Sequence, residues 1–418
     1  MSAPQVVTLG CRLNTLESEI MRSRATKAGL NDTIIINTCA VTAEAERQAR
    51  QTIRRLHRDN PAKRIIVTGC AAQLRPEKFA AMDEVDRVVG NSEKMDDGLL
   101  EGPGCEAVAV SDIMESPRNF NVPMISGFAE RTRAFVQVQQ GCDHRCTFCI
   151  IPFARGPNRS VHPSHIIEQV QTLTANGHFE VVLTGVDVSS YGQDDADLPS
   201  LGALARDILD QVSDLKRLRI TSLDPAFIDE DIPALLAGDE RFMPHLHLSL
   251  QAADDMVLKR MKRRHSRKDA IDLVARIRRA RPDVVFGADL IAGFPTETGA
   301  MFENTLSAVT EMGLTYLHVF PYSNRPGTAA SKMPALDGAL IKQRAAQLRE
   351  AGKEALLSYL NSCIGETHEV LVEQDRSGHT RHFAPLELTS DTALGAIVNT
   401  KVVSVDTEKG RLVADVLT

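Results

Sequence analysis

The feature that most constrains the fold of this chain is a long alternation of short, β-branched apolar runs with helical stretches. Among the first ninety residues, the two kinds of segment take turns at a spacing of about thirty residues. The runs are residues 5–10, 33–37, 64–69 and 86–90, and the helical stretches are residues 16–28, 43–59 and 76–82. Asn14 and Thr42 are the expected N-caps of the first two helices. This pattern predicts a parallel sheet in a small, doubly wound α/β domain.

A second, longer series of the same kind follows. Six apolar runs alternate with helical stretches, and a long helix at residues 340–360 closes the series. The runs are residues 134–139, 180–184, 217–222, 245–250, 284–290 and 316–320, and the helical stretches are residues 163–176, 201–213, 254–262, 267–281 and 297–312. Six βα units in series predict a partial (β/α)6 barrel, with site residues at the carboxyl ends of its strands.

Two stretches lack this alternation. Residues 91–133 are broken by Gly and Pro without clear periodicity, and we interpret them as a linker with surface segments. The last fifty residues contain short β-rich runs, at residues 369–373, 396–405 and 412–417, which predict a small all-β domain. The expected domains are therefore residues 1–115, 128–362 and 363–418.

Composition indicates in which compartment the protein is expected and which kinds of partner it can bind. No run of eighteen apolar residues occurs among the 418, so no membrane span is expected. The start lacks a basic segment followed by a long apolar one, so we expect no export signal and a cytoplasmic protein with reduced thiols. A net charge of −7 excludes a generally basic nucleic-acid binder, so any RNA contact must come from local patches.

Three of the eight cysteines form a Cys-x3-Cys-x2-Cys motif directly after the first predicted barrel strand. They are Cys142, Cys146 and Cys149. Thiolates are soft ligands that suit iron–sulfur clusters or zinc. A structural zinc site normally takes four ligands, and no fourth cysteine follows nearby. Three ligands on a four-iron cluster leave one iron open, as a catalytic cluster requires; a three-cysteine zinc site is the alternative.

Three further cysteines, Cys11, Cys39 and Cys70, each follow a predicted strand of the first domain by one or two residues. Because parallel strands point the same way, all three thiols are expected at the carboxyl edge of the sheet, where such domains bind ligands. Gly10 and Gly69 leave room there for a close backbone approach. We therefore predict a second three-thiolate site, with buried cysteines that merely pack as small apolar residues as the alternative.

These motifs resemble those of the methylthiotransferases of the radical S-adenosylmethionine (SAM) superfamily over nearly the whole chain. The cysteine loop carries an aromatic residue, Phe148, before its last cysteine, and the first domain carries Asn-Thr-Cys39 and Thr-Gly-Cys70. The C-terminal segment is similar to the TRAM domain of that family. Residues 37–50 and 149–156 look most like the MtaB type. That type adds a methylthio group to carbon 2 of N6-threonylcarbamoyladenosine next to the tRNA anticodon.

The resemblance implies cofactors and partners. The barrel cluster would be a [4Fe-4S] cluster that binds SAM at its open iron and cleaves it reductively to a 5′-deoxyadenosyl radical. A second [4Fe-4S] cluster on Cys11, Cys39 and Cys70 would hold the sulfur that is methylated and transferred. Such chemistry belongs to the cofactor, because no side-chain base removes an aromatic C–H proton between two ring nitrogens. The expected partners are tRNA and a flavodoxin- or ferredoxin-like electron donor, and a monomer is expected.

The resemblance and the strand-end positions also suggest binding residues. The residues expected to line the SAM pocket are Phe148, Gly185, Asp187, Ser222, Ser249, Gln251, Arg263, Asp289 and Tyr322. Basic residues gather on the helix after Cys39 and again between residues 259 and 281, either as solvated helix faces or as an RNA footprint. The residues expected to contact tRNA are Arg47, Arg50, Arg54 and Arg155.

Some features stay outside this picture. His245 and His247 share a strand face but have no evident third metal ligand, and we interpret them as ordinary histidines. Cys105 and Cys363 match neither cysteine set. Residues 366–418 carry nine acidic and five basic residues, so this domain is expected either to cover the barrel or to recognise RNA shape through His379, Arg381 and His382.

Three alternatives remain for the function. Two are the same chemistry on isopentenyladenosine of tRNA and on an aspartate of a ribosomal protein. The third is a non-catalytic iron–sulfur RNA-binding protein. An open iron separates it from the others, because a purely structural cluster would be better held by four thiolates.

Overall fold

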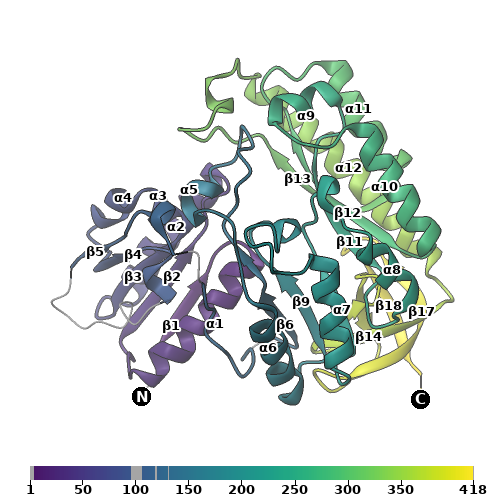
Figure 1. Cartoon of the computed structure of the whole chain (residues 1–418), viewed down its shortest axis with the longest axis horizontal. Helices are drawn as coiled ribbons and strands as arrows, with labels where there is room; N and C mark the ends of the chain where they lie inside the picture. Colours follow the sequence, from purple (N-terminus) through teal and green to yellow (C-terminus); the bar gives the residue numbers. More distant parts are fainter. Residues whose placement is uncertain (1–3, 96–105, 118–119, 130, 418) are drawn as a thin grey trace.

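The computed structural model of the chain describes residues 4–95, 106–117, 120–129 and 131–417. An N-terminal α/β domain, a central partial barrel and a C-terminal β domain follow one another along the sequence (Figure 1). In the described part of the chain, no helix combines the length and the apolar character that crossing a membrane would take.

The N-terminal domain is built on a five-stranded parallel sheet whose strand order follows the chain. Its strands are β1 (Gln5–Thr8), β2 (Thr33–Thr38), β3 (Arg64–Gly69), β4 (Arg87–Val89) and β5 (Val108–Ala109). Its helices are α1 (Arg12–Lys27), α2 (Ala43–Asp59), α3 (Cys70–Leu74) and α4 (Pro76–Ala80). Successive residues of a strand face opposite sides of the sheet, and both sides are buried here.

Helices cover both faces of this sheet, as predicted for a doubly wound domain. Ile34 and Ile36 of β2 pack with Ile53 of α2, whereas Ile35 between them packs with Met21 of α1. Because α1 and α2 lie on opposite faces while β1, β2 and β3 are neighbours in chain order, the two crossovers have opposite hands. One of them therefore departs from the right-handed rule.

The start of α1 differs from the prediction. Thr42 caps α2 as expected, since its side chain accepts a hydrogen bond from the Ala45 amide. Asn14, however, lies inside α1, which begins at Arg12 with Cys11 as N-cap. The Asn14 amide instead donates to two carbonyls that precede the thiols, those of Leu9 (2.7 Å) and Thr38 (3.1 Å). The Asn14 side chain therefore links the two loops by hydrogen bonds and does not cap the helix.

The central region contains the six predicted parallel strands. They form two three-stranded sheets, of β6 (Arg133–Gln137), β9 (Glu180–Thr184) and β10 (Arg217–Ile220), and of β11 (His245–Gln251), β12 (Val285–Ala292) and β13 (Leu314–Pro321). Parallel bridges pairing Leu218 with Phe242 and Leu223 with Leu248 join the two sheets. No pairing of β6 with β13 occurs within the described residues, so the barrel is open on that side.

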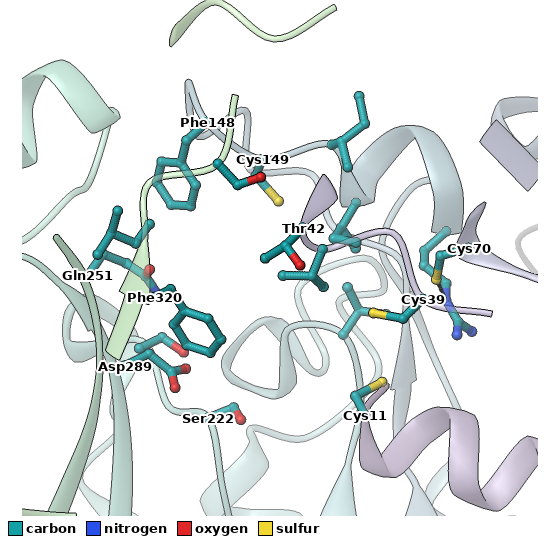
Figure 2. Close-up of a pocket in the computed structure, with 18 of the residues that line it drawn as sticks. Cys11, Cys39, Thr42, Cys70, Phe148, Cys149, Ser222, Gln251, Asp289 and Phe320 are labelled. Carbon is teal, nitrogen blue, oxygen red and sulfur yellow. Dashed lines mark hydrogen bonds between the residues drawn. The ribbon is translucent and has the colours of Figure 1, made fainter. Parts of the chain in front are cut away.

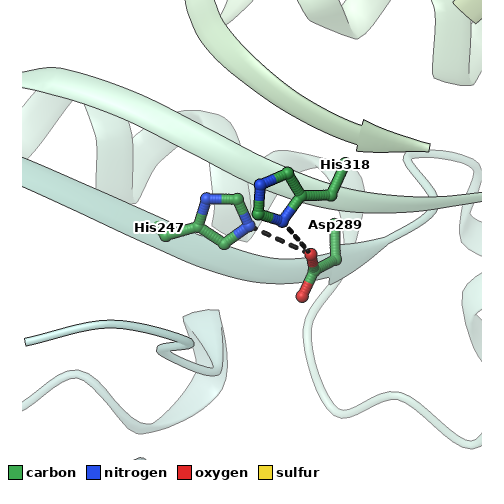
Figure 3. Close-up of side chains that lie close together, drawn as sticks. All are labelled: His247, Asp289 and His318. Atoms are coloured by element: carbon green, nitrogen blue, oxygen red, sulfur yellow. Dashed lines mark hydrogen bonds and ion pairs between the residues drawn. The ribbon is translucent and has the colours of Figure 1, made fainter. Parts of the chain in front are cut away.

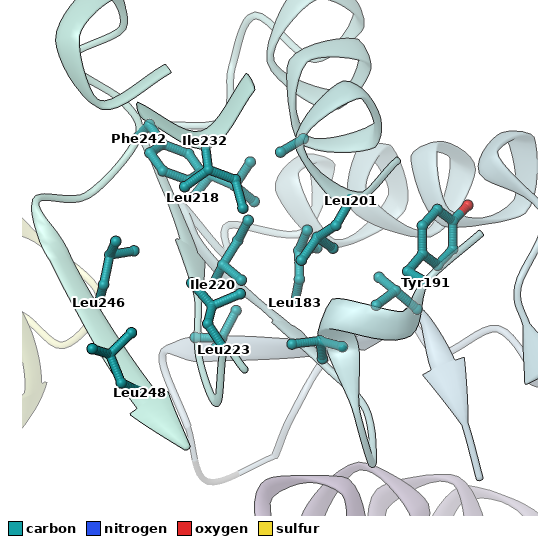
Figure 4. Close-up of a cluster of buried hydrophobic side chains, with 14 of the residues drawn as sticks. Leu183, Tyr191, Leu201, Leu218, Ile220, Leu223, Ile232, Phe242, Leu246 and Leu248 are labelled. Atoms are coloured by element: carbon teal, nitrogen blue, oxygen red, sulfur yellow. The ribbon is translucent and has the colours of Figure 1, made fainter. Parts of the chain in front are cut away.

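Helices cover the outside of the partial barrel (Figure 1). They are α6 (Pro163–Ala175), α7 (Leu201–Gln211), α8 (Asp231–Gly238), α9 (Asp255–Met261), α10 (Arg267–Ala280), α11 (Gly299–Glu311) and α12 (Gly338–Ser362). The cysteine loop leads into the short helix α5 (Ile151–Arg155) between two short strands, β7 (Gln139–Gln140) and β8 (Arg159–Ser160). Figure 4 shows the core between strands and helices, where Leu183 and Ile220 pack with Leu201 and Ile232.

Part of the predicted linker belongs to the barrel core. Val122, Ile125 and Phe128 are each 7% exposed and pack in the same apolar cluster as the barrel strands. The linker prediction was wrong for this part, because three apolar residues spaced by three without a regular element give no helix or strand signal. Leu16 and Ile20 of α1 join the same cluster, so the first domain is packed onto the barrel.

The C-terminal domain is a closed five-stranded β-barrel. Its strands are β14 (Thr367–Gln374), β15 (Ser377–Thr380), β16 (Pro385–Leu388), β17 (Ile397–Asp406) and β18 (Arg411–Val416). It lies against the amino ends of the central strands, where Arg219 donates to the carbonyls of Thr380 and Arg381. Buried Glu180 pairs with Arg217 and Arg219 beneath this contact. The C-terminal barrel therefore closes the end of the partial barrel opposite its strand carboxyl ends.

Candidate active site

One cavity of about 380 Å³ lies where the carboxyl edges of the N-terminal sheet and of the partial barrel meet. Cys11, Cys39 and Cys70 line one side, and Phe148 and Cys149 of the barrel loop line another (Figure 2). The whole N-terminal thiol set and one thiol of the barrel set therefore share this cavity.

The three N-terminal thiols are brought together by three consecutive strand ends. Cys11 follows β1 and caps α1, Cys39 follows β2, and Cys70 is the first residue of α3 after β3. Gly10 has a φ of +106°, and a Cβ there would lie 3.0 Å from the Sγ atom of Cys39. A larger residue would therefore fill the space beside the thiols, as the sequence predicted for this glycine.

The surroundings of these thiols favour a bound cation. Burial and the neighbouring thiols Cys70 and Cys11 raise the pKa of Cys39 to about 11, and burial also raises the pKa of Cys11. Metal ligation requires thiolates, so positive charge must offset this cost. The protein supplies one such charge, because the Nε atom of Arg155 donates to the Sγ atom of Cys70 at 3.0 Å.

Arg155 is not available to tRNA, and its prediction as an RNA contact was wrong. Its side chain is fully buried, and the guanidinium donates to Glu17, to the Oδ1 atom of Asn14 at 2.5 Å and to Cys70. Glu17 also pairs with buried Lys94, at 2.6 Å. Because Glu17 lies on α1 and Arg155 on α5, this buried network joins the first domain to the barrel loop behind the thiols.

The second thiol set lies on the loop that leads into α5. The Sγ atom of Cys142 is 3.6 Å from the carboxylate of Asp187, and the Sγ atom of Cys146 is 3.8 Å from the guanidinium of Arg263. Burial, followed by the charge of Asp187, raises the pKa of Cys142, and burial raises the pKa of Cys149 to about 12. A positively charged ligand would therefore also be needed here to stabilise the thiolate form of these cysteines.

Neither thiol set has the close spacing of a formed zinc site. Around zinc, with bonds of about 2.3 Å, the sulfur atoms lie about 4 Å apart. Among the described residues, only a group of two histidines and one aspartate has all its ligand atoms within 4.8 Å, and neither thiol set does. Among the described residues, no group this compact combines His144 with the thiols, and its Nε2 atom lies 3.0 Å from Asp187. Cys363 is buried in the C-terminal core, and Cys105 lies outside the described residues.

Seven of the nine residues predicted for the SAM pocket line the cavity. They are Phe148, Gly185, Ser222, Ser249, Gln251, Asp289 and Tyr322. Ser222 and Gln251 have φ values of 62° and 69°, a strained conformation that tends to occur at functional sites. Asp187 and Arg263 do not line the cavity and contact the cysteine loop instead.

The cavity also has walls that sequence reasoning missed. Val41 and Thr42, at the start of α2, and Phe320, at the end of β13, contribute to its lining. These two segments are held together across the domains, because the Ser323 hydroxyl accepts from the Ala43 amide at 3.1 Å and Arg325 pairs with Glu46. The position of Phe320 at a strand end was the one available signal.

The two histidines of β11 have different surroundings. The ring of His245 stacks on Phe383 of the C-terminal barrel, whereas His247 has potential metal ligands beside it that the sequence did not indicate. His247 meets Asp289 and His318, from the two following strands (Figure 3). The Oδ1 atom of Asp289 accepts from His247 at 3.0 Å and from His318 at 3.2 Å. Burial acts to raise the pKa of Asp289, but these hydrogen bonds hold it below the usual range.

The remaining predicted RNA contacts lie on α2. Arg47 is half-exposed and pairs with Glu44, and Arg54 is 61% exposed and lies 3.7 Å from Glu84. Arg50 lines a separate groove between α2 and the loop after β13. Three further basic residues of that groove are Arg75, Lys78 and Arg325.

Comparisons with known proteins agree with this geometry. The Radical SAM superfamily matches residues 136–309, and the Uncharacterized protein family UPF0004 matches residues 4–90. Among solved structures, the radical SAM methyltransferase TsrM from Kitasatospora setae with cobalamin and a [4Fe-4S] cluster bound is similar, with a TM-score of 0.56 at 17% identity over 77% of each chain. That likeness concerns the fold alone.

Curated relatives extend the similarity to the whole chain. The threonylcarbamoyladenosine tRNA methylthiotransferase MtaB of Rickettsia prowazekii is 46% identical over 96% of this chain and 95% of its own. The MtaB of Aquifex aeolicus is 33% identical over 94% and 98%. A tRNA-2-methylthio-N(6)-dimethylallyladenosine synthase of Novosphingobium aromaticivorans is 34% identical over 88% and 86%. The chain therefore belongs to the methylthiotransferase family of radical SAM enzymes.

Proposed function

We propose that this enzyme adds a methylthio group to carbon 2 of N6-threonylcarbamoyladenosine next to the anticodon of tRNA. One observation carries the reaction class: all three thiols of the N-terminal set and Cys149 of the barrel loop line a single cavity. The substrate rests on the 46% identity to a relative named for threonylcarbamoyladenosine, against 34% to one named for dimethylallyladenosine.

The cofactors follow in two steps. The enzyme uses SAM and a [4Fe-4S] cluster, as its family does, and Cys142, Cys146 and Cys149 would hold that cluster. We assign a second cluster to Cys11, Cys39 and Cys70. When bound, the two groups supply radical formation and the transferable sulfur, with an electron from a flavodoxin- or ferredoxin-like donor. The buried guanidinium of Arg155 would stabilise the thiolate of Cys70.

The protein supplies binding and orientation around these groups. The amino and carboxylate groups of SAM need polar partners, and Ser222, Ser249 and Gln251 offer them at adjacent strand ends. Phe148 offers an apolar contact beside Cys149. Asp187 and Arg263 would act through the cysteine loop, since each lies beside one of its sulfur atoms.

The substrate reaches the cavity from the side of α2, because the start of this helix forms part of the wall. Arg47, Arg50 and Arg54 follow on the same helix and would bind the phosphate backbone. The groove lined by Arg50, Arg75 and Lys78 offers a basic path beside the cavity.

Nucleoside mass spectrometry of tRNA from a deletion strain tests the substrate. We expect the 2-methylthio form of threonylcarbamoyladenosine to disappear and the unmodified parent to accumulate. Loss of the methylthio group from isopentenyladenosine would instead indicate the related substrate. An unchanged tRNA profile would contradict both assignments and direct the search to ribosomal proteins.

Iron analysis tests the second cluster. The anaerobically reconstituted enzyme should hold about eight iron atoms per chain, and about four after Cys11, Cys39 and Cys70 are all replaced by alanine. The variant Cys39→Ala should lose methylthiolation yet still form some 5′-deoxyadenosine, whereas Cys146→Ala should form none. Methylthiolation by Cys39→Ala would contradict the role of the second site.

A further inference from the structure

A polar corner in the interior of the partial barrel has no role in the reaction described so far. His247, Asp289 and His318 come from three neighbouring strands, and Asp289 lines the cavity (Figure 3). Both histidines donate to the same carboxylate oxygen, Oδ1. The Nε2 atom of His318 has no hydrogen-bond partner among the described residues. The side chain of His318 is 57% exposed.

Arg12 belongs to the same corner. It is the first residue of α1, between Cys11 and Leu13, which both line the cavity. Its half-buried side chain makes no hydrogen bond or ion pair with any residue that the structure describes. Burial lowers the pKa of Arg12, as does the charge of Arg133, whereas the carboxylate of Asp289 raises it. Arg12 thus lies among inward-facing groups of the barrel.

Other arginines of the cavity wall and of the partial barrel are already paired. Arg155 is held by Glu17, and Arg263 pairs with Asp224 at 2.9 Å. Arg133 pairs with Glu373, and Arg219 pairs with Glu180. A half-buried guanidinium without a partner is costly, and an anionic ligand would remove that cost. Arg12 is therefore the arginine of this set that is free to bind a substrate anion.

We propose that Arg12 binds the carboxylate of the amino acid substituent on the adenosine, with the Nε2 atom of His318 accepting a hydrogen bond from the hydroxyl of that substituent. This inference rests on the proposed function and explains its specificity. A threonylcarbamoyl group carries a carboxylate that a guanidinium binds in a bidentate manner. An isopentenyl group has no polar atom and would leave Arg12 buried without a partner, so the enzyme would discriminate against it.

The test compares a tRNA anticodon stem-loop that carries threonylcarbamoyladenosine with the same stem-loop after methyl esterification of the carboxylate. Methylthiolation by the full-length reconstituted enzyme is followed by nucleoside mass spectrometry. We expect Arg12→Gln to lower kcat/KM for the acid by about 10- to 100-fold. Arg12→Lys should recover part of that loss, because it keeps the charge without the bidentate geometry.

The ester separates carboxylate recognition from other roles of Arg12. It should lower kcat/KM of the wild-type enzyme by a similar factor but change little for Arg12→Gln, because the two changes remove the same contact. Lys27→Gln is the matched control: it removes an exposed charge from the same helix, about 22 Å further along. It should leave kcat/KM for both substrates unchanged.

Other outcomes would overturn the proposal. An Arg12→Gln effect of equal size on acid and ester would indicate a phosphate contact or a structural role. Equal use of acid and ester by the wild-type enzyme would exclude recognition of the carboxylate. If Arg12→Gln loses iron, Arg12→Lys takes its place, because it keeps the charge, and it should prefer the acid less strongly than the wild-type enzyme does. A wild-type enzyme that modifies only isopentenyladenosine would instead refute the proposed substrate.

Discussion

At the scale of single residues, Glu17 is a buried carboxylate outside the cavity that balances the charges of two buried cations. It lies on α1 with its side chain 1% exposed, and it pairs with two buried cations, Arg155 and Lys94. Burial acts to raise its pKa, but these two charges hold the pKa of Glu17 at about 2. The carboxylate is what allows Arg155 to remain charged beside Cys70.

Replacing Glu17 by Gln should therefore destabilise the protein strongly. At pH 7 two buried cations would lose their partner, which costs about 3 kcal/mol and, in a chain of 418 residues, lowers the melting temperature by about 3 to 4 °C. Thermal melting of the metal-free chain measures this. Glu19→Gln is the control on the same helix, because Glu19 makes only a loose pair with Arg22 at 3.9 Å. Similar melting of both variants would contradict the role of the network.

The same carboxylate predicts a pH dependence. Its folded pKa of about 2 lies below the unfolded value of about 4.3, so its stabilisation is complete above the unfolded value. It is lost as the pH falls from about 5 towards 2. The difference in melting temperature between the wild-type chain and Glu17→Gln should accordingly shrink at pH 4 relative to pH 7. A constant difference would show that Glu17 does not titrate in this way.

At the scale of elements, α2 joins the cavity to the expected path of the RNA. Val41 and Thr42, which directly precede the helix, form part of the cavity wall, and Arg50 and Arg54 are four residues apart on one helical face. Replacing both by Glu should weaken tRNA binding and lower the slope of log K against log salt by about 0.7 to 0.9 for each phosphate that the enzyme no longer neutralises. Binding measured over a salt series tests this.

A matched double variant controls for the change in net charge. Lys342 and Lys353 are exposed on α12 and are three helical turns apart, so they also share a face. Their replacement by Glu should leave the salt slope near that of the wild-type enzyme. If the α2 variant also keeps the wild-type slope, its arginines form a solvated face and do not contact phosphate.

The elements also show what the sequence can and cannot predict. The convergence of Cys11, Cys39 and Cys70 was predictable, because parallel strand ends share one edge of a sheet whatever the rest of the chain does. The burial of Arg155 was not, since it depends on Glu17, 138 positions away in the sequence. His318 was missed for a similar reason: its meeting with Asp289 depends on the register of β12 with β13.

At the scale of the whole molecule, the C-terminal barrel acts as a cover. The three residues that could have read RNA shape are engaged within the protein: Arg381 pairs with Glu240 and His382 with Asp283 of the central region, and His379 bonds Glu373 and stacks on Phe383 within its own domain. Of the two roles considered for this acidic domain, the contacts favour closing the amino end of the barrel. That end lies opposite the cavity, so the cover protects the polar interior without obstructing the substrate.

Phe383 at the centre of this contact offers the test. Its ring stacks on His245, with centroids 4.9 Å apart, and lies under the guanidinium groups of Arg133 and Arg219. Phe383→Ala should cost about 2 kcal/mol and lower the melting temperature. The salt slope of tRNA binding should stay unchanged, because the substitution removes no charge that would bind phosphate. Val403→Ala, which truncates an exposed apolar side chain of the same barrel, should change neither property. A slope that falls by about one in Phe383→Ala, without loss of stability, would make this domain an RNA-binding element instead.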